Sequence, residues 1–353
     1  MPLQTANQRA NADVRRLLNY FAALPQRPSR RLVSGQHIGF SPMLCESGNG
    51  VENFRDHVEE VHEATGRWIA MIGGDYGCNP RNVKPFHDLT PLNDLLIDWW
   101  RAGGLVTVCF HAPNPFIPEA SAWLHNHWIG QDYPAHNLRN LITPGRPGYD
   151  LWRQYLERCA AGLTRLRDAG VVVIWRPFHE MTGGWFWWGR EAFGDDPEAF
   201  KDLWRDMFVT FSDEFDLDNL LWNYTASNAP SLAQDACYPG EEFADMVGQD
   251  LYDDDAQISG YEALCRLGKP VNLGEFGPGR PGLNGAMEPY DYRRMLRALK
   301  EDFPQVIAWK SWVSSLSRKK DRIRFSLRDN EGAADVLNDP WVITRDTLDW
   351  RNH

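Results

Sequence analysis

The segment VVVIWRPFHE (171–180) constrains the fold more than any other part of this chain, because it has the pattern of a buried strand that ends at a carboxylate. Its first five residues are apolar, as expected for a strand that is covered on both faces in a parallel sheet. Pro177 cannot donate to a strand ladder, so the strand should end near it. His179 and Glu180 follow directly, and parallel α/β folds place their functional groups at such strand ends. An apolar loop that contains a glutamate by chance is the alternative.

Short strand patterns recur along the whole chain, and helical patterns separate most of them. The eight strand candidates are residues 32–37, 67–76, 104–111, 171–180, 219–225, 245–252, 270–276 and 306–312. This alternation predicts the α/β class, with a (β/α)8 TIM barrel that spans residues 1–353 as a single domain with long βα loops. An open doubly wound sheet is the alternative, but no G-x-G-x-x-G or Walker loop follows an early strand.

Helix signals and one long insertion complete this outline. Helices are expected in a lead-in at about residues 8–24, from Leu151 to a stop at Gly170, after Asp196–Pro197 and around residues 292–300. The principal insertion follows the third strand, spans about residues 112–149 and is rich in Pro, Asn and Trp. Loops of this length usually have a function, so we expect a lid or the wall of a binding site.

The acidic composition restricts the partners. The 353 residues carry a formal net charge of −11 with a sequence pI near 5.4, whereas nucleic-acid binding needs a basic surface. We therefore expect no nucleic-acid partner. As a separate expectation, the protein is a monomer. No apolar run approaches the ~20 residues of a membrane helix, so we also expect no membrane segment. The N-terminus lacks the apolar core of a signal peptide, which predicts a cytoplasmic protein or a secreted one whose signal has been trimmed.

The cysteines and histidines do not predict a metal site, because no C-x-x-C pair or zinc-like His/Cys spacing occurs. Cys109 and Cys159 lie in apolar patterns and are expected to be core thiols. In an exported protein, one or two disulfides can form among the other four, which are Cys45, Cys78, Cys237 and Cys265. We expect neither a metal nor an organic cofactor.

Polar and aromatic residues gather at the predicted strand ends, where a barrel has its active site. These candidates are Asp75, Tyr76, His111, Arg176, His179, Glu180, Tyr252, Glu275 and Trp309. Glu180 and Glu275 end strands four and seven, which lie on nearly opposite sides of a small barrel. Their carboxyl groups can therefore face each other at the ~5–5.5 Å separation that retaining glycosidases use. Alternatively, either glutamate is a structural partner of Arg176.

Aromatic residues surround this pair of acids. Four of them follow Glu180 between glycines, and ring faces beside a carboxylate suit the C–H faces of a sugar. Trp185 and Trp309 are the predicted sugar platforms, whereas Trp187 and Trp188 could equally be packing inside the loop. The strand-end residues and these rings together predict a carbohydrate site.

The segment RPFHEMTGGWFWWG (176–189) resembles the signature of glycoside hydrolase family 26, whose members are mostly endo-β-1,4-mannanases. The resemblance extends to SGQH (34–37), FHAPNP (110–115), YPGEEFADMVGQDLY (238–252) and GEFG (274–277). It implies a retaining (β/α)8 glycosidase with Glu180 as the acid/base and Glu275 as the nucleophile. It also implies sugar contacts or carboxylate support from His111, Arg176, His179, Trp185, Tyr252 and Trp309.

Three positions depart from the family pattern, namely Phe110, Thr182 and the Trp-Lys-Ser triplet at 309–311. They bear on which sugar fits, because the family also includes mixed-linkage β-glucanases and β-1,3-xylanases. The expected substrate is β-1,4-mannan, glucomannan or galactomannan. A non-catalytic carbohydrate-binding protein is an alternative from another class, but binding alone does not need two opposed acids. A metal-dependent hydrolase would need histidines at ligand spacing, which this chain lacks.

Overall fold

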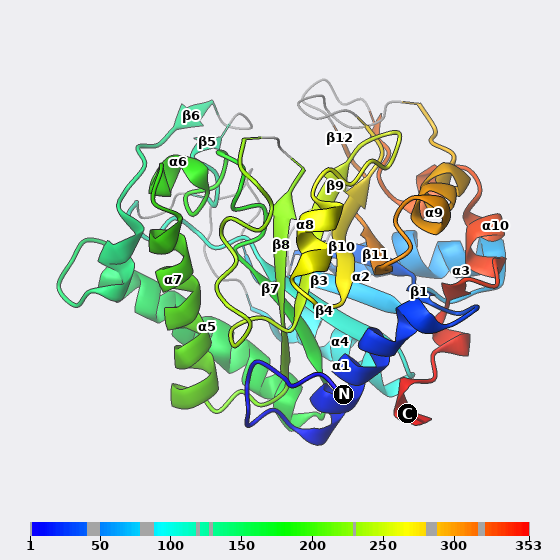
Figure 1. Ribbon diagram of the computed structural model, residues 1–353, viewed down its shortest axis with the longest axis horizontal. Coiled ribbons are helices and arrows are strands. Elements are labelled where there is room, and N and C mark those ends of the chain that lie inside the picture. The colour runs from blue at the N-terminus through cyan, green and yellow to red at the C-terminus, as the bar shows by residue number, and fades with distance from the viewer. Residues whose placement is uncertain are drawn as a thin grey trace.

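Eight parallel strands form a closed barrel at the centre of the molecule (Figure 1). The structure is a computed structural model that describes residues 2–40, 50–77, 88–117, 121–126, 130–228, 231–279, 288–316 and 322–352. The barrel strands are β2 (Gly35–Phe40), β3 (Met71–Asp75), β4 (Leu105–Phe110), β7 (Val173–Pro177), β8 (Leu220–Ser227), β9 (Met246–Tyr252), β10 (Val271–Gly277) and β11 (Val306–Ser311). The pairing of Ser311 with Gln36 closes the ring. This confirms the predicted TIM barrel.

The eight predicted strands correspond to the barrel strands, although their ends differ by a few residues. The first predicted strand (32–37) is divided in the structure: a short strand, β1 (Leu32–Val33), precedes β2 and pairs with β14 (Val342–Ile343). Ser34 lies between the two strands, where its hydroxyl donates to the carbonyl of Ile343 (2.8 Å) and accepts from the backbone N–H of Ala70 (3.0 Å). Its own backbone N–H and carbonyl are also paired, with Ile343 and Met71.

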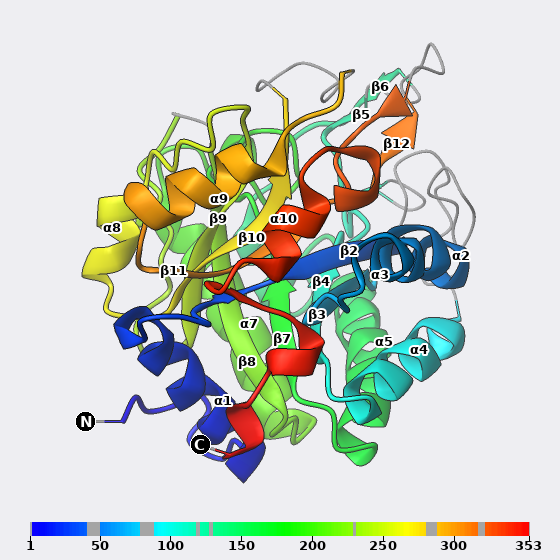
Figure 2. The ribbon, with the colours of Figure 1, turned by 90° about the vertical axis from the view of Figure 1, so that its right-hand side faces the viewer.

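Helices cover the outside of the barrel (Figure 2). α5 (Tyr149–Asp168) carries the predicted apolar stripe, in which Tyr155, Cys159 and Leu163 are buried. The other helices are α1 (Ala12–Ala23), α2 (Gly50–Phe54), α3 (Glu60–Thr65), α4 (Thr90–Arg101), α6 (Arg190–Phe193), α7 (Pro197–Val209), α8 (Tyr261–Arg266), α9 (Tyr292–Glu301) and α10 (Ala333–Asn338). In the described ranges, no helix is both long and apolar enough to cross a membrane.

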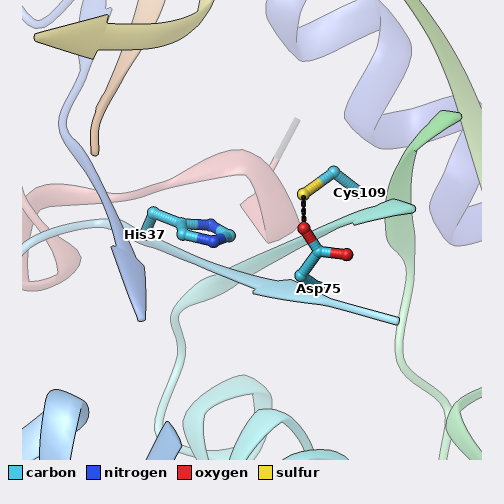
Figure 3. Close-up of side chains that lie close together, drawn as sticks. All are labelled: His37, Asp75 and Cys109. Atoms are coloured by element: carbon cyan, nitrogen blue, oxygen red, sulfur yellow. Dashed lines mark hydrogen bonds between the residues drawn. The ribbon is translucent and has the colours of Figure 1, made fainter. Parts of the chain in front are cut away.

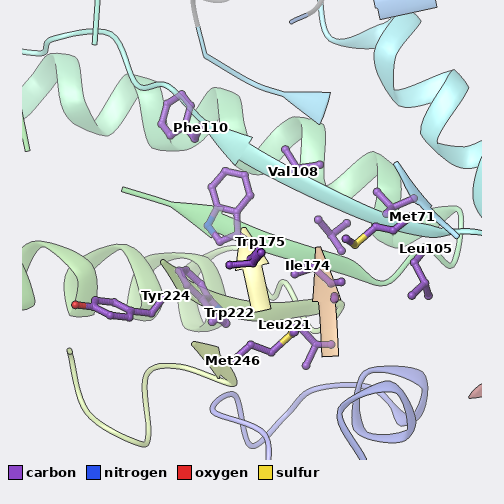
Figure 4. Packing of buried hydrophobic residues seen from close by; sticks show 14 of the residues in the cluster. Met71, Leu105, Val108, Phe110, Ile174, Trp175, Leu221, Trp222, Tyr224 and Met246 are labelled. Atoms are coloured by element: carbon purple, nitrogen blue, oxygen red, sulfur yellow. The ribbon is translucent and has the colours of Figure 1, made fainter. Parts of the chain in front are cut away.

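Side chains fill the barrel interior, and α1 covers one of its ends. Side chains alternate between the barrel interior and the layer beneath the helices, as strand geometry requires. Trp175 lies in the outer layer, where it packs on Phe110 with ring centroids 6.2 Å apart (Figure 4). In the interior, Phe21 of α1 borders the same space as Ile174. α1 therefore covers the N-terminal end of the barrel, and barrels of this kind place their sites at the C-terminal ends of the strands.

The long loop after β4 contributes to the wall at that C-terminal end. It contains a short antiparallel hairpin of β5 (His125–Asn126) and β6 (Gln131–Asp132). The backbone N–H of Leu124 donates to the carbonyl of Trp185 (2.8 Å), which ties the hairpin to the loop after β7. The insertion therefore lies against the aromatic segment that follows Glu180.

The cysteines in the described part of the chain are free thiols. Cys109 and Cys159 are fully buried, which confirms that they are core thiols. Cys237 and Cys265 do not form a disulfide. The other two cysteines considered for pairing, Cys45 and Cys78, lie outside the described residues.

Candidate active site

Glu180 lies in the loop directly after β7, at the C-terminal end of the barrel. Its φ is 59° and that of Phe178 is 49°, a region that residues other than glycine rarely adopt. The N–H of Glu180 donates to the carbonyl of Thr225 on β8, and its own carbonyl accepts from the N–H of Gly183, both at 2.9 Å. Such backbone strain costs about 1–3 kcal/mol and is concentrated at functional sites. The fold therefore holds Glu180 in a costly conformation that directs its side chain.

Glu275 lies on β10, where two donors hold its carboxylate. The guanidinium of Arg176 donates to Oε1, and the hydroxyl of Tyr252 donates to Oε2 at 2.6 Å. Burial and the charge of Glu275 raise the pKa of Tyr252, so its hydroxyl keeps the proton and remains a donor. With a partner on each oxygen and 3% exposure, the carboxylate of Glu275 has a fixed orientation.

Arg176 is fully buried and binds a second carboxylate, that of Asp250. Its Nη1 donates to Oδ2 of Asp250 at 2.5 Å and to the hydroxyl of Thr225 at 3.2 Å. Asp250 was not among the predicted site residues. A buried cation needs charged partners, and removal of one of them is strongly destabilising. Arg176 thus joins Asp250 and Glu275 into one network below the mouth of the barrel.

The carboxyl group of Glu180 has a different environment from that of Glu275. Its Oε2 accepts a hydrogen bond from the indole N–H of Trp185 at 2.7 Å. Burial and the negative charges of Asp250 and Glu275 raise the pKa of Glu180 well above its ordinary value. A carboxyl group that keeps its proton near neutral pH can act as a general acid.

His111 and His179 lie between this network and β3. Their Nε2 atoms are 3.1 Å apart, and Nε2 of His179 is 3.9 Å from Oε1 of Glu275. Nδ1 of His111 is hydrogen-bonded to the carboxylate of Asp75. Burial and the positive charge of Arg176 lower the pKa of His179 well below its ordinary value, so this imidazole is neutral.

Two clusters among the described residues have the composition of a metal site, with ligand atoms within 4.8 Å of one another. They are His179, Asp250 and Glu275, and His37, Asp75 and Cys109. In the first cluster, Arg176 already places a positive charge on both carboxylates. In the second, Asp75 accepts from His111 and from the thiol of Cys109 at 3.1 Å (Figure 3). Both clusters fit hydrogen-bonded carboxylates better than metal ligands.

Sequence comparison agrees with this geometry. The family model described as glycosyl hydrolase family 26 matches residues 6–347, nearly the whole chain. The chain belongs to glycosyl hydrolase family 26.

Curated relatives and solved structures are similar to almost the full length of this chain, which spans less than two thirds of the first relative described here. The chain is 29% identical over 360 residues to mannan endo-1,4-beta-mannosidase A and B of Caldalkalibacillus mannanilyticus, covering 98% of this chain and 63% of that protein. It is 29% identical to a mannan endo-1,4-beta-mannosidase of Bacillus subtilis, covering 96% and 88%. The structure of Bacillus subtilis mannanase man26 has a TM-score of 0.81 at 26% identity and covers 98% of this chain and 96% of that one.

In this family 26 hydrolase, the prediction that Trp309 is a sugar platform is wrong. Trp309 is fully buried in the hydrophobic core, on the opposite side of β11 from Lys310, which borders the barrel interior. Trp312, three residues later, is partly exposed. Its ring stacks on His37 with centroids 3.8 Å apart and lies 6.0 Å from the ring of His111. The structure therefore brings Trp312, which was not predicted, to the site.

Burial also contradicts a substrate contact for Asp75 and Tyr76. Tyr76 is 1% exposed, and its hydroxyl donates to Asn93 of α4 at 2.6 Å. It faces the helices because it follows Asp75 by one residue on an extended backbone, and neighbouring side chains point to opposite sides. Asp75 has no exposed surface and binds His111.

The other predicted residues of the family 26 site are brought together at two depths. Trp185 and Tyr252 are partly exposed, and 6% of His111 is exposed. Arg176 and His179, each 1% exposed, lie deeper and support the carboxylates. Trp187 and Trp188, which the sequence could not assign to sugar binding or to packing, are both buried. Their indole N–H groups donate to backbone carbonyls at 2.8 and 2.9 Å, so they are packing residues.

Substitution of the tryptophans should separate packing from binding. Trp309→Ala is expected to destabilise the fold by about 3–5 kcal/mol, because it removes a large core side chain. Trp185→Ala is expected to leave the melting temperature nearly unchanged and to lower turnover of oligosaccharides. Thermal unfolding and kcat/KM for both variants measure this, and a normal melting temperature for Trp309→Ala would contradict its placement in the core.

Proposed function

We propose that this chain hydrolyses β-1,4-mannosidic bonds within mannan, glucomannan or galactomannan, by a double displacement that retains the anomeric configuration. The main support is the contrast between its two glutamates. Two donors hold Glu275, whereas burial and negative charge keep a proton on Glu180. The family and the names of the relatives support mannan as the substrate.

In the first step, Glu275 attacks the anomeric carbon, and the new C–O bond forms as the glycosidic C–O bond breaks. Glu180 transfers its proton to the departing oxygen, so the leaving sugar departs as a neutral alcohol. Arg176 and Tyr252 keep the attacking carboxylate oriented throughout. The product is a glycosyl ester on Glu275.

In the second step, Glu180 acts as a base. Formation of the ester removes the negative charge of Glu275, which is one cause of the raised pKa of Glu180. Glu180 then takes a proton from a water molecule, whose oxygen attacks the anomeric carbon. Glu275 leaves with the electron pair of the ester bond. Two inversions at one carbon give net retention.

The surroundings of the glutamates support binding of a polysaccharide by a monomer. Trp185 and Trp312 offer partly exposed ring faces beside the two acids. In the described part of the chain, the large apolar side chain that is exposed is that of Val209. This is too little apolar surface for a stable dimer interface. The net charge of −11 supports the absence of a nucleic-acid partner.

The three departures from the family pattern lie away from the exposed surface. Phe110, Lys310 and Ser311 are at most 1% exposed, and the hydroxyl of Thr182 is hydrogen-bonded to Ser227 at 2.8 Å. They therefore do not favour a different sugar. A mixed-linkage β-glucanase or β-1,3-xylanase gains no support from these positions.

The substrate can be tested directly. We expect faster hydrolysis of β-1,4-mannan or glucomannan than of barley mixed-linkage glucan, xylan or cellulose, because mannose differs from glucose and xylose in its axial 2-hydroxyl. Release of reducing ends from the polysaccharides and product profiles from manno-oligosaccharides measure rate and position of cleavage. Equal or faster hydrolysis of the mixed-linkage glucan would reject mannan as the substrate and leave the two-glutamate mechanism intact.

A further inference from the structure

We propose that Asp75 is a positioning residue that fixes which nitrogens of His111 and His179 carry protons, and through them steadies both catalytic glutamates. The chain of contacts begins at a carboxylate with no exposed surface and ends 3.9 Å from Oε1 of Glu275. The proposal rests on the proposed function only in its kinetic test, because the proton positions can be measured without substrate.

Asp75 is surrounded by hydrogen-bond donors. Its Oδ1 accepts the backbone N–H groups of Gly77 (2.7 Å) and His111 (3.0 Å). Its Oδ2 accepts the thiol of Cys109 (3.1 Å), drawn in Figure 3, and Nδ1 of His111. A Cβ at position 77 would lie 2.1 Å from the carbonyl oxygen of His111, so glycine is required there. Burial alone would raise the pKa of Asp75, but the side-chain and backbone hydrogen bonds from His111 hold it below its ordinary value.

These contacts assign the protons of both histidines. An ionised carboxylate can only accept, so Nδ1 of His111 carries a proton. The neutral ring of His179 carries one proton, and its Nδ1 is buried without a hydrogen-bond partner among the described residues, so the proton lies on Nε2. Nε2 of His179 therefore donates to Nε2 of His111, 3.1 Å away. The hydrogen bonds therefore run from His179 to His111 to Asp75.

This order matters for both glutamates. It directs an N–H of His179, rather than a lone pair, toward the side of the ring where Glu275 lies. His179 also precedes Glu180, and its carbonyl accepts the indole N–H of Trp188 at 2.9 Å. Its anchored ring thus steadies the turn in which Glu180 has a positive φ. Asp75 therefore acts on both acids through His111 and His179, although it has no exposed surface with which to contact substrate.

The variant Asp75→Asn is expected to reverse the order. The backbone N–H groups of Gly77 and His111 can only donate, so the amide oxygen must remain at the Oδ1 position. The amide nitrogen must then take the place of Oδ2, where it donates to Nδ1 of His111. His111 has to become the Nε2–H form, and His179 has to move its proton to Nδ1.

Nitrogen-15 NMR of histidine-labelled protein measures these forms, with assignments from His111→Gln and His179→Gln. We expect Nδ1–H on His111 and Nε2–H on His179 in the unmodified chain, and the reverse in Asp75→Asn. We also expect kcat on manno-oligosaccharides to fall on the order of 100-fold with little change in KM, because groups that contact substrate stay in place. A charged or Nε2–H form of His111 in the unmodified protein would overturn the proposal, whether or not the variant folds.

Two controls separate positioning from a general loss of stability. Asp245 is another fully buried aspartate that holds backbone N–H groups, those of Ala6 (2.6 Å) and Trp222 (2.8 Å). Asp245→Asn is expected to lower the melting temperature and to leave kcat and the histidine spectra unchanged. In a His111→Gln background, Asp75→Asn is expected to cost little further activity. Additive losses, or a normal kcat for Asp75→Asn alone, would overturn the proposal.

Discussion

Replacement of Glu275 by alanine or glutamine is expected to abolish hydrolysis of every substrate, with a fall in kcat on the order of 10⁵-fold or more, because no glycosyl-enzyme can form. The glutamine variant is the cleaner test. Its amide keeps the shape of the side chain and an oxygen that can accept from Arg176 or Tyr252. The alanine variant also leaves the buried Arg176 with one carboxylate fewer and should unfold at a lower temperature.

Release of reducing ends from mannan and thermal unfolding measure this result. The matched control is Glu198→Gln on α7, an exposed glutamate paired with Lys201, which is expected to retain normal kcat. If Glu275→Gln kept more than a small part of the activity at a normal melting temperature, Glu275 would be a structural partner of Arg176, the alternative that the sequence left open.

The two glutamates and the barrel could be predicted because their signals are local in the sequence. Each barrel strand is a short, mostly apolar segment; Glu180 follows one of them, and Glu275 lies near the C-terminal end of another. Equivalent ends of parallel strands meet at one end of a closed barrel, so two such acids must come together there. This argument needs the order of the strands but not their precise ends.

Trp309 could not be placed in this way, because its position depends on a strand end. A shift of one residue moves a side chain from one face of a strand to the other, and strand ends are uncertain by one or two residues. The segment VIAWKSW contains two tryptophans, and the one at position 312 lies beyond the last residue of β11. The same uncertainty placed Tyr76 in the site, although its side chain faces α4.

The buried supports of the site had weaker signals. Asp250 precedes Tyr252 by two residues on β9, so the two share a face, which was the signal available for it. Cys109 was expected to be an ordinary core thiol, and its contact with Asp75 depends on the pairing of β3 with β4. Contacts between neighbouring strands set these roles, and a sequence pattern along one strand does not contain them.

Replacement of Glu180 by alanine is expected to give a different defect from the loss of Glu275. Hydrolysis of mannan should fall steeply, because its poor leaving group needs a proton. An aryl mannoside with an acidic phenol should still form the glycosyl-enzyme, since the phenol leaves unaided. The intermediate then accumulates and gives a burst of phenol. In the unmodified enzyme, activity should fall as pH rises through the raised pKa of Glu180, and this alkaline limb should disappear from the burst step of the variant.

Azide distinguishes the roles of the two acids. In Glu180→Ala, azide should enter the space left by the side chain and attack the glycosyl-enzyme without a base, which speeds turnover and releases a β-azide. Proton NMR of the unmodified reaction should show the β-anomer as the first product, because two inversions retain the configuration. An α-anomer as the first product would reject the retaining mechanism. A β-azide from the Glu275 variant, together with an α-azide from the Glu180 variant, would mean that Glu180 is the nucleophile and Glu275 the acid/base.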